Sequence, residues 1–470
     1  MRDIGWTALL LVNSLALVYF ALLNSTSLLT SLAAYRSLRR YAQRLKTVDV
    51  LELLRSGAAQ SITVVAPAYN EEATCVEATR SLLTLEYPEY EILVVNDGSK
   101  DATLERLSEA FDLAPAPRFP AADIPSKRVR GTYRSTRYPY LWVIDKENGG
   151  KADAINAGLN FVRTPLFCTI DSDSLLEPEA LLRVSRPFLE DARTIAAGGI
   201  VRIVNGSTVW ASRVMDVRLP RSMLARLQVL EYLRAFHSGR LGWAELNATM
   251  IISGAFGLFK RSVVVEAGGF ASGTVGEDME LVVRLHRHCH ENGIPYRIVY
   301  IPDPVAWTEC PETVKGLRVQ RDRWQRGLTE VLTRNLRLLF NPSYGSVGFL
   351  AFPYFFFLEM LGPVIEVVGY IAFAVTIFVG LASLSYVLAF LMLAILFGIA
   401  LSIAVIGLEE LTFRRYHRTA DLARLFWLAI AENFGYRQLN SLWRIKGMIS
   451  FLRGRHDWGE LTRKGFATSD

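Results

Sequence analysis

Two aspartates separated by one residue close an apolar stretch of the chain. The stretch 166–170 reads Leu-Phe-Cys-Thr-Ile, and Asp171 and Asp173 follow it closely. Residues two apart in a strand point to the same side. At the end of a strand, two such carboxylates can jointly hold a divalent cation and a ligand that carries a diphosphate. The spacing therefore predicts a site of this kind.

Polar residues also follow three other stretches that have the pattern of buried strands. In an open α/β sheet, ligands bind beyond the carboxyl ends of the strands. An aromatic ring could pack against a base, an aspartate could accept a hydrogen bond from it, and a lysine after two glycines suits a diphosphate. Each feature alone could be a turn or a helix cap, but together they favour a nucleotide site. The residues are Tyr69 and Glu71, Asp97, and Lys151.

Three acidic residues stand at the start of a predicted helix over 279–290. They are Glu277, Asp278 and Glu280. Transfer of a group to an acceptor hydroxyl needs a general base, and these carboxylates are the candidates. The alternative is that they only complement the helix dipole, which favours acids at a helix start.

The run His-Arg-His-Cys-His at 286–290 has the residue types of a metal cluster. However, Leu281, Val282, Leu285 and Cys289 form the apolar face of the same predicted helix. We therefore expect the histidines to be solvated rather than to bind zinc.

Strands and helices alternate from residue 61 onward, which predicts βαβ units and a parallel sheet. The segment 113–140 is rich in proline and arginine and is expected to be a surface loop. In a second half, 194–204 and 248–259 have strand character. Leucines recur at helical spacing within 223–236, and this stripe is interpreted as packing.

The 470 residues could hold two or three domains. The apolar residues crowd into the first thirty positions and into 345–408, which predicts one cytosolic domain with membrane segments at both ends. The net charge is +6, with basic residues beside the apolar segments. That placement favours anionic lipid headgroups over nucleic acid as partners. Four scattered cysteines indicate free thiols.

Residues 4–33 are long enough to span a bilayer as a helix. Basic residues follow at once and place this end in the cytoplasm, so that the N-terminus lies outside. They are Arg36, Arg39, Arg40, Arg44 and Lys46.

Further membrane segments are predicted after residue 316. A helix over 316–340 should lie near the membrane surface, and 362–382 with 384–408 should form a tight transmembrane hairpin. The stretch 352–361 reads as interfacial or as a broken helix entry, and Glu359 and Glu366 are either functional intramembrane carboxylates or interfacial residues. The charged stretch 422–452 reads as an interfacial or re-entrant helix. The chain is therefore expected to divide into an N-terminal transmembrane helix (1–35), a cytosolic basic linker (36–60), the α/β domain (61–315), interfacial helices (316–361), the transmembrane hairpin (362–410) and a cytosolic or interfacial C-terminal segment (411–470).

Six motifs occur in one order: APAYNEE (66–72), NDGS (96–99), GGKADAIN (149–156), DSD (171–173), GED (276–278) and QRDRW (320–324). In these the chain resembles the processive family 2 glycosyltransferases, which include cellulose, chitin, hyaluronan and poly-N-acetylglucosamine synthases. The resemblance implies an α/β fold, a nucleotide-binding, Rossmann-like glycosyltransferase A domain. That domain would be cytosolic and inserted between transmembrane and interfacial helices of a multi-pass plasma-membrane protein.

The resemblance also implies an activity. The protein would be an inverting enzyme that polymerises a β-linked polysaccharide from a UDP-sugar and moves it across the membrane, with Mg²⁺ or Mn²⁺ as cofactor. Its partners would be the donor, the growing polysaccharide, the lipid bilayer and an optional export or accessory subunit. The implied roles are uridine binding by Tyr69, Glu71 and Asp97, diphosphate contact by Lys151, donor binding by Asp171, metal ligation by Asp173, general base catalysis by Asp278, and contacts to the acceptor end and diphosphate by Gln320, Arg323 and Trp324.

The donor sugar is indicated by Ser253 and Gly254, a pair that resembles hyaluronan and chitin-type synthases and favours UDP-N-acetylglucosamine. These two residues and Glu277 are the expected acceptor contacts. The family's threonine before the Glu-Asp pair is replaced by Gly276, so a hydroxyl contact is lost. The alternatives are a non-processive transferase acting on a lipid-linked acceptor, a cellulose-type enzyme using UDP-glucose, and a silent scaffold or export subunit.

Overall fold

The computed structural model describes residues 2–45, 57, 59–171, 174–210, 213–412, 416 and 418–455. The chain divides into two units, and each is described by itself. The helical unit comprises Met1–Leu38, Leu219–Glu245 and Pro311–Leu461, and the sheet unit comprises Arg39–Arg218, Leu246–Cys310 and Thr462–Asp470. Asp173, the expected metal ligand, lies outside the described residues.

A ten-stranded mixed sheet forms the centre of the sheet unit, in the order β3-β4-β5-β2-β1-β6-β11-β8-β12-β7. Its middle strands β5, β2, β1 and β6 are parallel, as expected from their apolar runs. Parallel strands covered on both faces are nearly continuously apolar. The bounds are β1 (Ile62–Ala68), β2 (Tyr90–Asn96), β3 (Leu113–Pro115), β4 (Val129–Ser135), β5 (Leu141–Lys146), β6 (Leu166–Ile170), β7 (Ser174–Leu176), β8 (Thr194–Ile203), β11 (Phe256–Lys260) and β12 (Arg297–Thr308).

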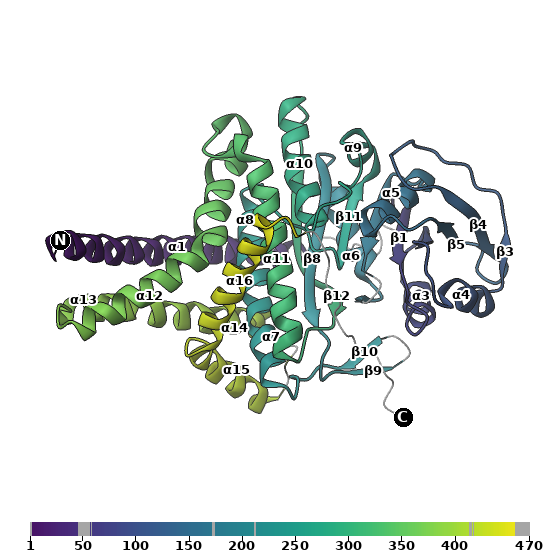
Figure 1. The fold of residues 1–470 in the computed structure, drawn as a ribbon. Helices are drawn as coiled ribbons and strands as arrows, with labels where there is room; N and C mark the ends of the chain where they lie inside the picture. The colour runs from purple at the N-terminus through teal and green to yellow at the C-terminus, as the bar shows by residue number, and fades with distance from the viewer. Residues whose placement is uncertain are drawn as a thin grey trace. The chain divides into compact units, whose positions relative to one another are not determined.

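Helices cover both faces of this sheet. Helix α5 packs its apolar side chains against β1 and β2, and shares one core with α9 and α10. Helices α3 and α4 lie on the other side of β1 and β2 from α5 (Figure 1). The bounds are α3 (Cys75–Leu83), α4 (Thr103–Phe111), α5 (Lys151–Phe161), α6 (Ala180–Glu190), α9 (Arg261–Glu266) and α10 (Glu277–Glu291). The expected α/β fold is thus confirmed.

The expectation of a surface loop over 113–140 is wrong. The segment contains β3 and β4, which extend the sheet by antiparallel pairing beyond β5. These strands lie at the edge and are only partly buried, so they lack the apolar runs that reveal the central strands. Similarly, only Phe256–Lys260 of the stretch 248–259 is a strand. A separate hairpin consists of β9 (Thr208–Trp210) and β10 (Arg213–Asp216).

The helical unit contains the apolar helices. Among the described residues, Gly5–Gln43 and Leu384–Glu410 are long and apolar enough to cross a membrane, and the pair Val347–Met360 and Gly362–Phe378, bent by 47°, would make a third span. The bounds are α1 (Arg2–Leu45), α7 (Met223–Arg234), η2 (Ala235–Arg240), α8 (Leu241–Glu245), α11 (Val314–Arg334), η3 (Leu336–Leu338), η4 (Pro342–Tyr344), η5 (Val347–Ala351), η6 (Tyr354–Met360), α12 (Gly362–Phe378), α13 (Leu384–Leu391), η7 (Met392–Leu396), α14 (Phe397–Thr412), α15 (Thr419–Ala431) and α16 (Tyr436–Leu452).

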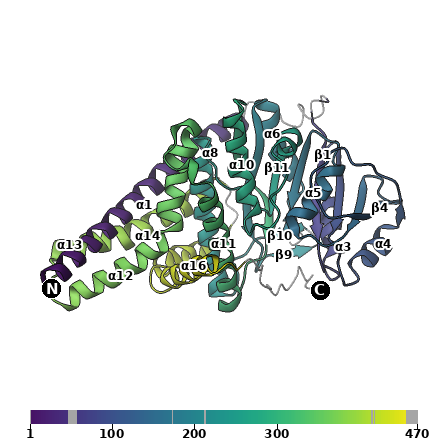
Figure 2. The ribbon, with the colours of Figure 1, turned by 45° about the horizontal axis from the view of Figure 1, so that its top comes forward.

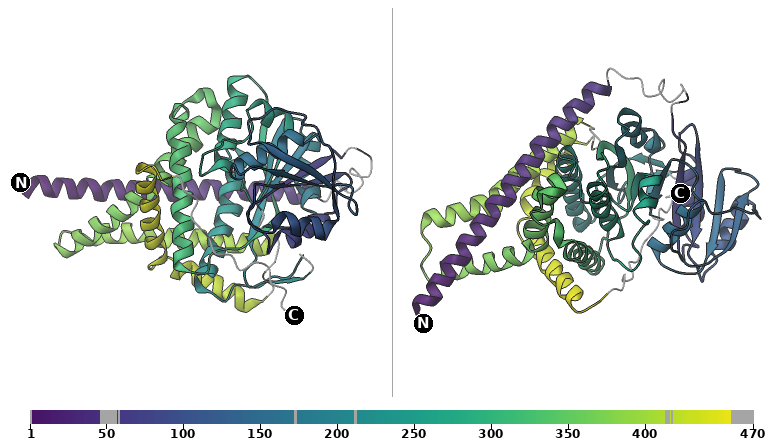
Figure 3. Two further views of the ribbon diagram at one scale, coloured as in Figure 1. Left: turned by 45° about the vertical axis from the view of Figure 1, so that its right-hand side comes forward. Right: turned by 90° about the horizontal axis from the view of Figure 1, so that it is seen from above.

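Helices α12 and α13 are joined as a hairpin. The rings of Phe373 and Phe390 stack with centroids 4.0 Å apart, and the turn uses Gly380 in the left-handed region. Asn13 of α1 donates to Thr376 and accepts from Tyr386. Helix α1 therefore packs against this hairpin (Figures 2 and 3). Helix α12 ends at Phe378, earlier than expected, and it passes as a span only together with the helix before the Gly362-Pro363 break.

The stretch 422–452 is not one helix. It contains the end of α15 and all of α16, which are separated at Gly435 in the left-handed region. Helix α16 packs along α11. Both glutamates near the bend have partners within the unit: Glu366 accepts from Tyr19 and Ser441, and Glu359 forms an ion pair of 3.3 Å with Arg444. All four cysteines are buried free thiols, as expected.

Candidate functional site

The carboxyl ends of β5, β2, β1 and β6 lie side by side at one edge of the sheet. The chain moves outward from β1 to β2 and β5, and then returns to the opposite side of β1 with β6. Such a reversal of strand order opens a crevice at the carboxyl ends. The four sequence motifs that follow these strands therefore meet at one edge, as predicted.

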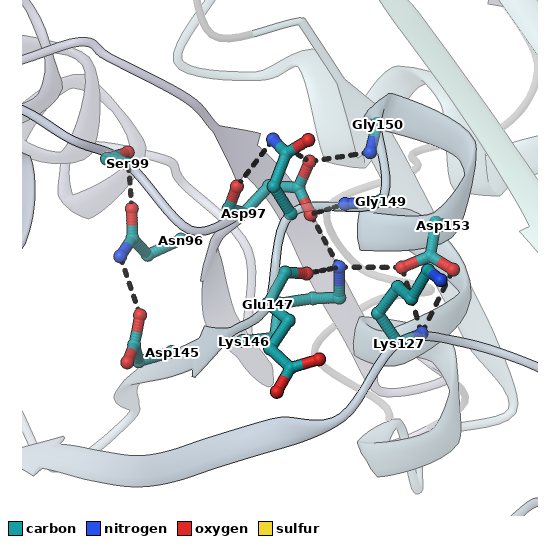
Figure 4. Close-up of polar contacts among 11 residues, drawn as sticks. Asn96, Asp97, Ser99, Lys127, Asp145, Lys146, Glu147, Gly149, Gly150 and Asp153 are labelled. Carbon is teal, nitrogen blue, oxygen red and sulfur yellow. Dashed lines mark hydrogen bonds and ion pairs between the residues drawn. The ribbon is translucent and has the colours of Figure 1, made fainter.

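Asp97 follows β2 and is only 2 % exposed. Its carboxylate accepts hydrogen bonds from Gly149 N at 3.0 Å, Gly150 N at 2.7 Å and Asn148 Nδ2 at 3.1 Å. The Asn148 amide also donates to the Asp97 carbonyl at 2.9 Å. Asp97 thus anchors the turn that leads into α5 (Figure 4). A base that bonded to this carboxylate would replace one of these donors.

Lys146 is a residue of this site that the sequence interpretation missed. It ends β5, its side chain is fully buried, and its ammonium contacts Asp97 Oδ1 at 2.5 Å and Asp153 Oδ1 at 2.6 Å. It also donates to the Glu147 carbonyl. The available signal was a lysine that closes an apolar strand directly before the Asn-Gly-Gly turn.

The loops after β1 and β2 are joined by hydrogen bonds. Asn70 N donates to Ser99 Oγ at 3.0 Å, and Glu71 N donates to Thr103 Oγ1 at 2.9 Å. Glu71 also accepts from Thr74. Tyr69, next to Asn70, leaves 44 % of its surface exposed. The Tyr69 ring is accessible to a base, and the Tyr69 backbone belongs to a loop that hydrogen bonds hold to the loop after β2.

Lys151 lies between two carboxylates. Its ammonium is 2.5 Å from Asp171 Oδ1 and 2.8 Å from Glu277 Oε1. Burial alone would lower the pKa of Lys151, but these two charges outweigh burial and raise that pKa above its usual value. Burial, opposed by Lys151 and reinforced by Asp278, raises the pKa of Glu277. Lys151 is therefore a permanent cation at the strand ends.

Asp278 begins the first turn of α10 beside Gly254. Gly254 N donates to Asp278 Oδ2 at 3.2 Å, while Asp278 Oδ1 accepts from Met279 N at 2.8 Å. Glu280, the third candidate base, is instead paired with Arg284 at 2.7 Å. Ser253 precedes Gly254 and accepts from Ala255 N at 3.4 Å. The structure thus brings together Lys151, Asp171, Ser253, Gly254, Glu277 and Asp278 in the sheet unit.

Within the described ranges there is no group of three or more histidine, cysteine or acidic side chains placed to hold a metal ion. Magnesium, however, usually takes one or two protein carboxylates together with substrate phosphates rather than a cage made by the protein. One aspartate with a bound diphosphate would meet that requirement. The carboxylate oxygens at this strand end are therefore suitable ligands for a divalent cation that is also bound by a diphosphate.

The QRDRW motif lies on α11 in the helical unit. Gln320 is buried and Trp324 is 42 % exposed. Arg321, inside the motif, pairs with Glu231 of α7 at 2.5 Å and stacks over the Trp324 ring at 4.5 Å. Tyr436 and Asn440 of α16 also donate to Glu231, at 2.8 and 3.0 Å. Glu231, which the sequence interpretation did not single out, therefore fixes the motif to two other helices.

The expectation that the α10 histidines are solvated is wrong for His286. This ring is fully buried, with Nδ1 2.7 Å from Tyr296 Oη and Nε2 2.8 Å from the Thr249 carbonyl. Burial lowers the pKa of His286 to about 4. Both ring nitrogens are occupied by protein groups, so His286 is a satisfied core histidine.

Comparison with known proteins places these features in a wider group. Residues 59–327 match the family described as glycosyltransferase like family 2. Poly-β-1,6-N-acetyl-D-glucosamine synthase of Staphylococcus aureus (strain COL) is 29 % identical over 276 residues, which are 59 % of this chain and 56 % of that protein. The synthase of Staphylococcus epidermidis is 28 % identical over the same shares. The chain thus matches little more than half the length of these relatives.

Two solved structures show a partial likeness to this chain. The mannosyltransferase PcManGT from Pyrobaculum calidifontis, in complex with GDP-Man and Mn²⁺, is 18 % identical with a TM-score of 0.48, and the match covers 88 % of this chain and 99 % of that one. S. aureus TarS 1–349 in complex with UDP-GlcNAc is 16 % identical with a TM-score of 0.41, covering 80 % and 92 %.

Proposed function

The chain belongs to the family 2 glycosyltransferases, and we propose that it polymerises a β-linked polysaccharide from UDP-N-acetylglucosamine. The observation that carries this proposal is that Lys151, Asp171 and Asp278 lie close together at the strand ends of a family 2 domain. The choice of sugar rests on the relatives named above, which are poly-N-acetylglucosamine synthases, and on the Ser253-Gly254 pair.

Donor binding is assigned to the strand-end loops. The exposed ring of Tyr69 would pack against uracil, and Glu71 would bind the uridine. Asp97 would bind the uridine by exchanging one of its present hydrogen-bond donors for the base. Lys151 would face the diphosphate. Its ammonium is already charged and held between Asp171 and Glu277, so a diphosphate would meet a fixed cation. A preorganised charge of this kind stabilises the leaving group as it gains negative charge.

A divalent cation, Mg²⁺ or Mn²⁺, would be held by Asp173 together with the diphosphate. When bound, such an ion neutralises charge on the departing nucleotide. Asp171, paired with Lys151, would contact the donor at the same strand end.

The chemical step would be a direct displacement with inversion. Asp278 would take the proton of the acceptor hydroxyl, whose oxygen would form a bond to the anomeric carbon. The bond from that carbon to the diphosphate oxygen would break, and UDP would leave with its electron pair. Asp278 suits the task because it has no arginine partner in the part of the chain that the structure describes, whereas Glu280 is bound to Arg284. Ser253, Gly254 and Glu277 would border the acceptor.

Polymerisation and export are assigned to the helical unit. Gln320, Arg323 and Trp324 would contact the acceptor end and the diphosphate, and the polymer would leave through the apolar helices. The two or three candidate spans would place the protein in the plasma membrane as a multi-pass protein. The basic residues that follow the apolar stretch 4–33 would then put the N-terminus outside and the catalytic domain in the cytoplasm, where an export or accessory subunit could join it.

The proposal is tested by UDP release from the purified full chain with a panel of UDP-sugars, each with Mg²⁺, Mn²⁺ or a chelator. UDP-N-acetylglucosamine with either metal should give the fastest release, and the chelator should abolish it. Fastest release from UDP-glucose would assign the enzyme to cellulose-type synthesis instead. No release from any UDP-sugar would refute the proposed activity.

A further inference from the structure

Lys146 is a buried cation that joins two elements of the donor site. Its side chain has no exposed surface, and its ammonium lies 2.5 Å from Asp97 and 2.6 Å from Asp153. Asp97 follows β2, whereas Asp153 lies in the first turn of α5. Buried charges are stable only when paired and hydrogen-bonded, so all three side chains depend on one another. Figure 4 shows the ammonium between the two carboxylates.

The carboxylate of Asp97 has no spare capacity. It accepts from Lys146, Asn148 and the two backbone amides of Gly149 and Gly150. A carboxylate offers about four lone-pair positions, and these four donors fill them. The orientation of Asp97 is thus fixed jointly by Lys146 and by the turn that follows it.

The turn leaves no room for a side chain at Gly149 or at the neighbouring Gly98. A Cβ on Gly149 would lie 2.3 Å from Asp153 Oδ1, and a Cβ on Gly98 would lie 2.6 Å from Asn148 N. Asp153 also accepts from Lys127 N at 3.0 and 3.1 Å. A shift of either carboxylate therefore moves the Gly149–Gly150 backbone, and with it Lys151, the next residue.

We propose that Lys146 is a positioning residue of the donor site: its ammonium ties Asp97 to Asp153 and so holds the turn that presents Lys151 to the diphosphate. This inference rests on the proposed function, because the diphosphate in question is that of the UDP-sugar. It assigns to Lys146 no contact with the substrate. Its effect reaches the donor at two points, through Asp97 at the base and through Lys151 at the phosphates.

The direct test is K146M, which keeps most of the side-chain length and removes the charge. We expect the dissociation constant of UDP, measured by calorimetry on the purified full chain, to rise at least about tenfold, which corresponds to roughly 1.4 kcal/mol. The KM for UDP-N-acetylglucosamine should rise in parallel, with a smaller change in kcat. A merely structural role would lower the active fraction and hence kcat, with KM unchanged.

Two further variants separate positioning from folding. The double variant K146M/D153N keeps the net charge of the buried cluster at that of the wild type, since one positive and one negative charge are removed together. It should fold even where K146M does not, and still show the raised dissociation constant. The matched control is R118M. Arg118 is a buried cation paired at 2.8 Å with Glu91, near the opposite end of β2, and its loss should lower stability with no change in UDP affinity.

The outcomes are distinct. Weakened UDP binding in K146M or K146M/D153N, with wild-type affinity in R118M, supports the positioning role. Unchanged affinity in the folded lysine variants, or an equal loss in R118M, overturns it and leaves the proposed function intact. A wild-type protein that binds no UDP overturns the proposed function and this inference with it.

Discussion

Gly254 and Lys151 lie so close that a Cβ on the glycine would stand 2.7 Å from the Lys151 ammonium nitrogen. The same Cβ would approach Asp171 Oδ2 to 3.5 Å. The Lys151 ammonium reaches Asp171 and Glu277 through space that a side chain at position 254 would fill, so this position requires glycine. This explains why a glycine follows Ser253 beside the acidic start of α10.

The variant G254A should displace the Lys151 ammonium, because the end of a flexible side chain yields before the backbone does. Hydrogen bonds to charged groups contribute roughly 1.5–3 kcal/mol, so we expect UDP affinity to fall about tenfold or more. Titration of UDP into the purified variant measures this. The control G407A adds a Cβ that meets no atom within 4 Å and should bind UDP normally. Normal binding by G254A would show that Lys151 does not contact the diphosphate.

Replacement of Asp278 by asparagine should stop transfer without preventing donor binding. General base catalysis contributes about 10²- to 10⁴-fold, so the rate of UDP release from D278N should fall by that order while UDP affinity stays near wild type. E280Q is the matched control, since Glu280 is occupied by Arg284, and it should keep most of its activity. Loss in E280Q with retention in D278N would reassign the base.

Acid should destabilise the protein partly through His286. Burial lowers its pKa to about 4 in the folded state, against about 6.5 when unfolded. A depressed pKa gives stability that is present above about pH 6.5 and lost as the pH falls towards 4, at about 1.4 kcal/mol per pH unit. The melting temperature of H286Q should therefore fall less steeply than that of the wild type over this window. Parallel curves for the two proteins would exclude the His286 contribution.

Glu231 should control the QRDRW motif indirectly. The variant E231Q removes the counter-charge of the buried Arg321 guanidinium, which stacks over Trp324. Breaking a buried ion pair costs about 3–5 kcal/mol, so the melting temperature should fall. Polymer yield should drop, and UDP affinity with it, because the motif is assigned a contact to the diphosphate. R80Q breaks the Arg80–Glu77 pair of α3, in which both side chains are more than half exposed, and should have little effect. Equal polymer yield in E231Q and wild type would contradict this role.

The sequence revealed the parts of the fold whose pattern depends only on local burial. The strands β1, β2, β5 and β6 lie under helices on both faces. Their apolar runs, and the polar residues that follow these runs, could therefore be recognised in the sequence. The strands β3 and β4 could not be predicted, because both are partly exposed at this end of the sheet and the pairing of β4 with β5 is set by residues distant in the sequence. The two helices α12 and α13 could be predicted from hydropathy. Hydropathy did not show that α12 is too short to count as a span without the helix before the bend at Gly362.

The candidate site was predictable where a residue follows a strand and hidden where the role depends on a distant partner. Lys146 is buried because Asp97 and Asp153 converge on it, and no local pattern announces two partners from separate elements. Glu231 likewise acquires its role from Arg321, Tyr436 and Asn440. His286 was misjudged because periodicity showed its apolar neighbours but not Tyr296 and the Thr249 carbonyl.

The most direct test of the central claim is the size of the product made from radiolabelled UDP-N-acetylglucosamine by the purified full chain. The account predicts long chains at early times, while most donor is still unreacted, and complete digestion of those chains by glycosidases specific for β-linked N-acetylglucosamine. A product that carries a single added sugar on a lipid, with no longer species at any time, would contradict it.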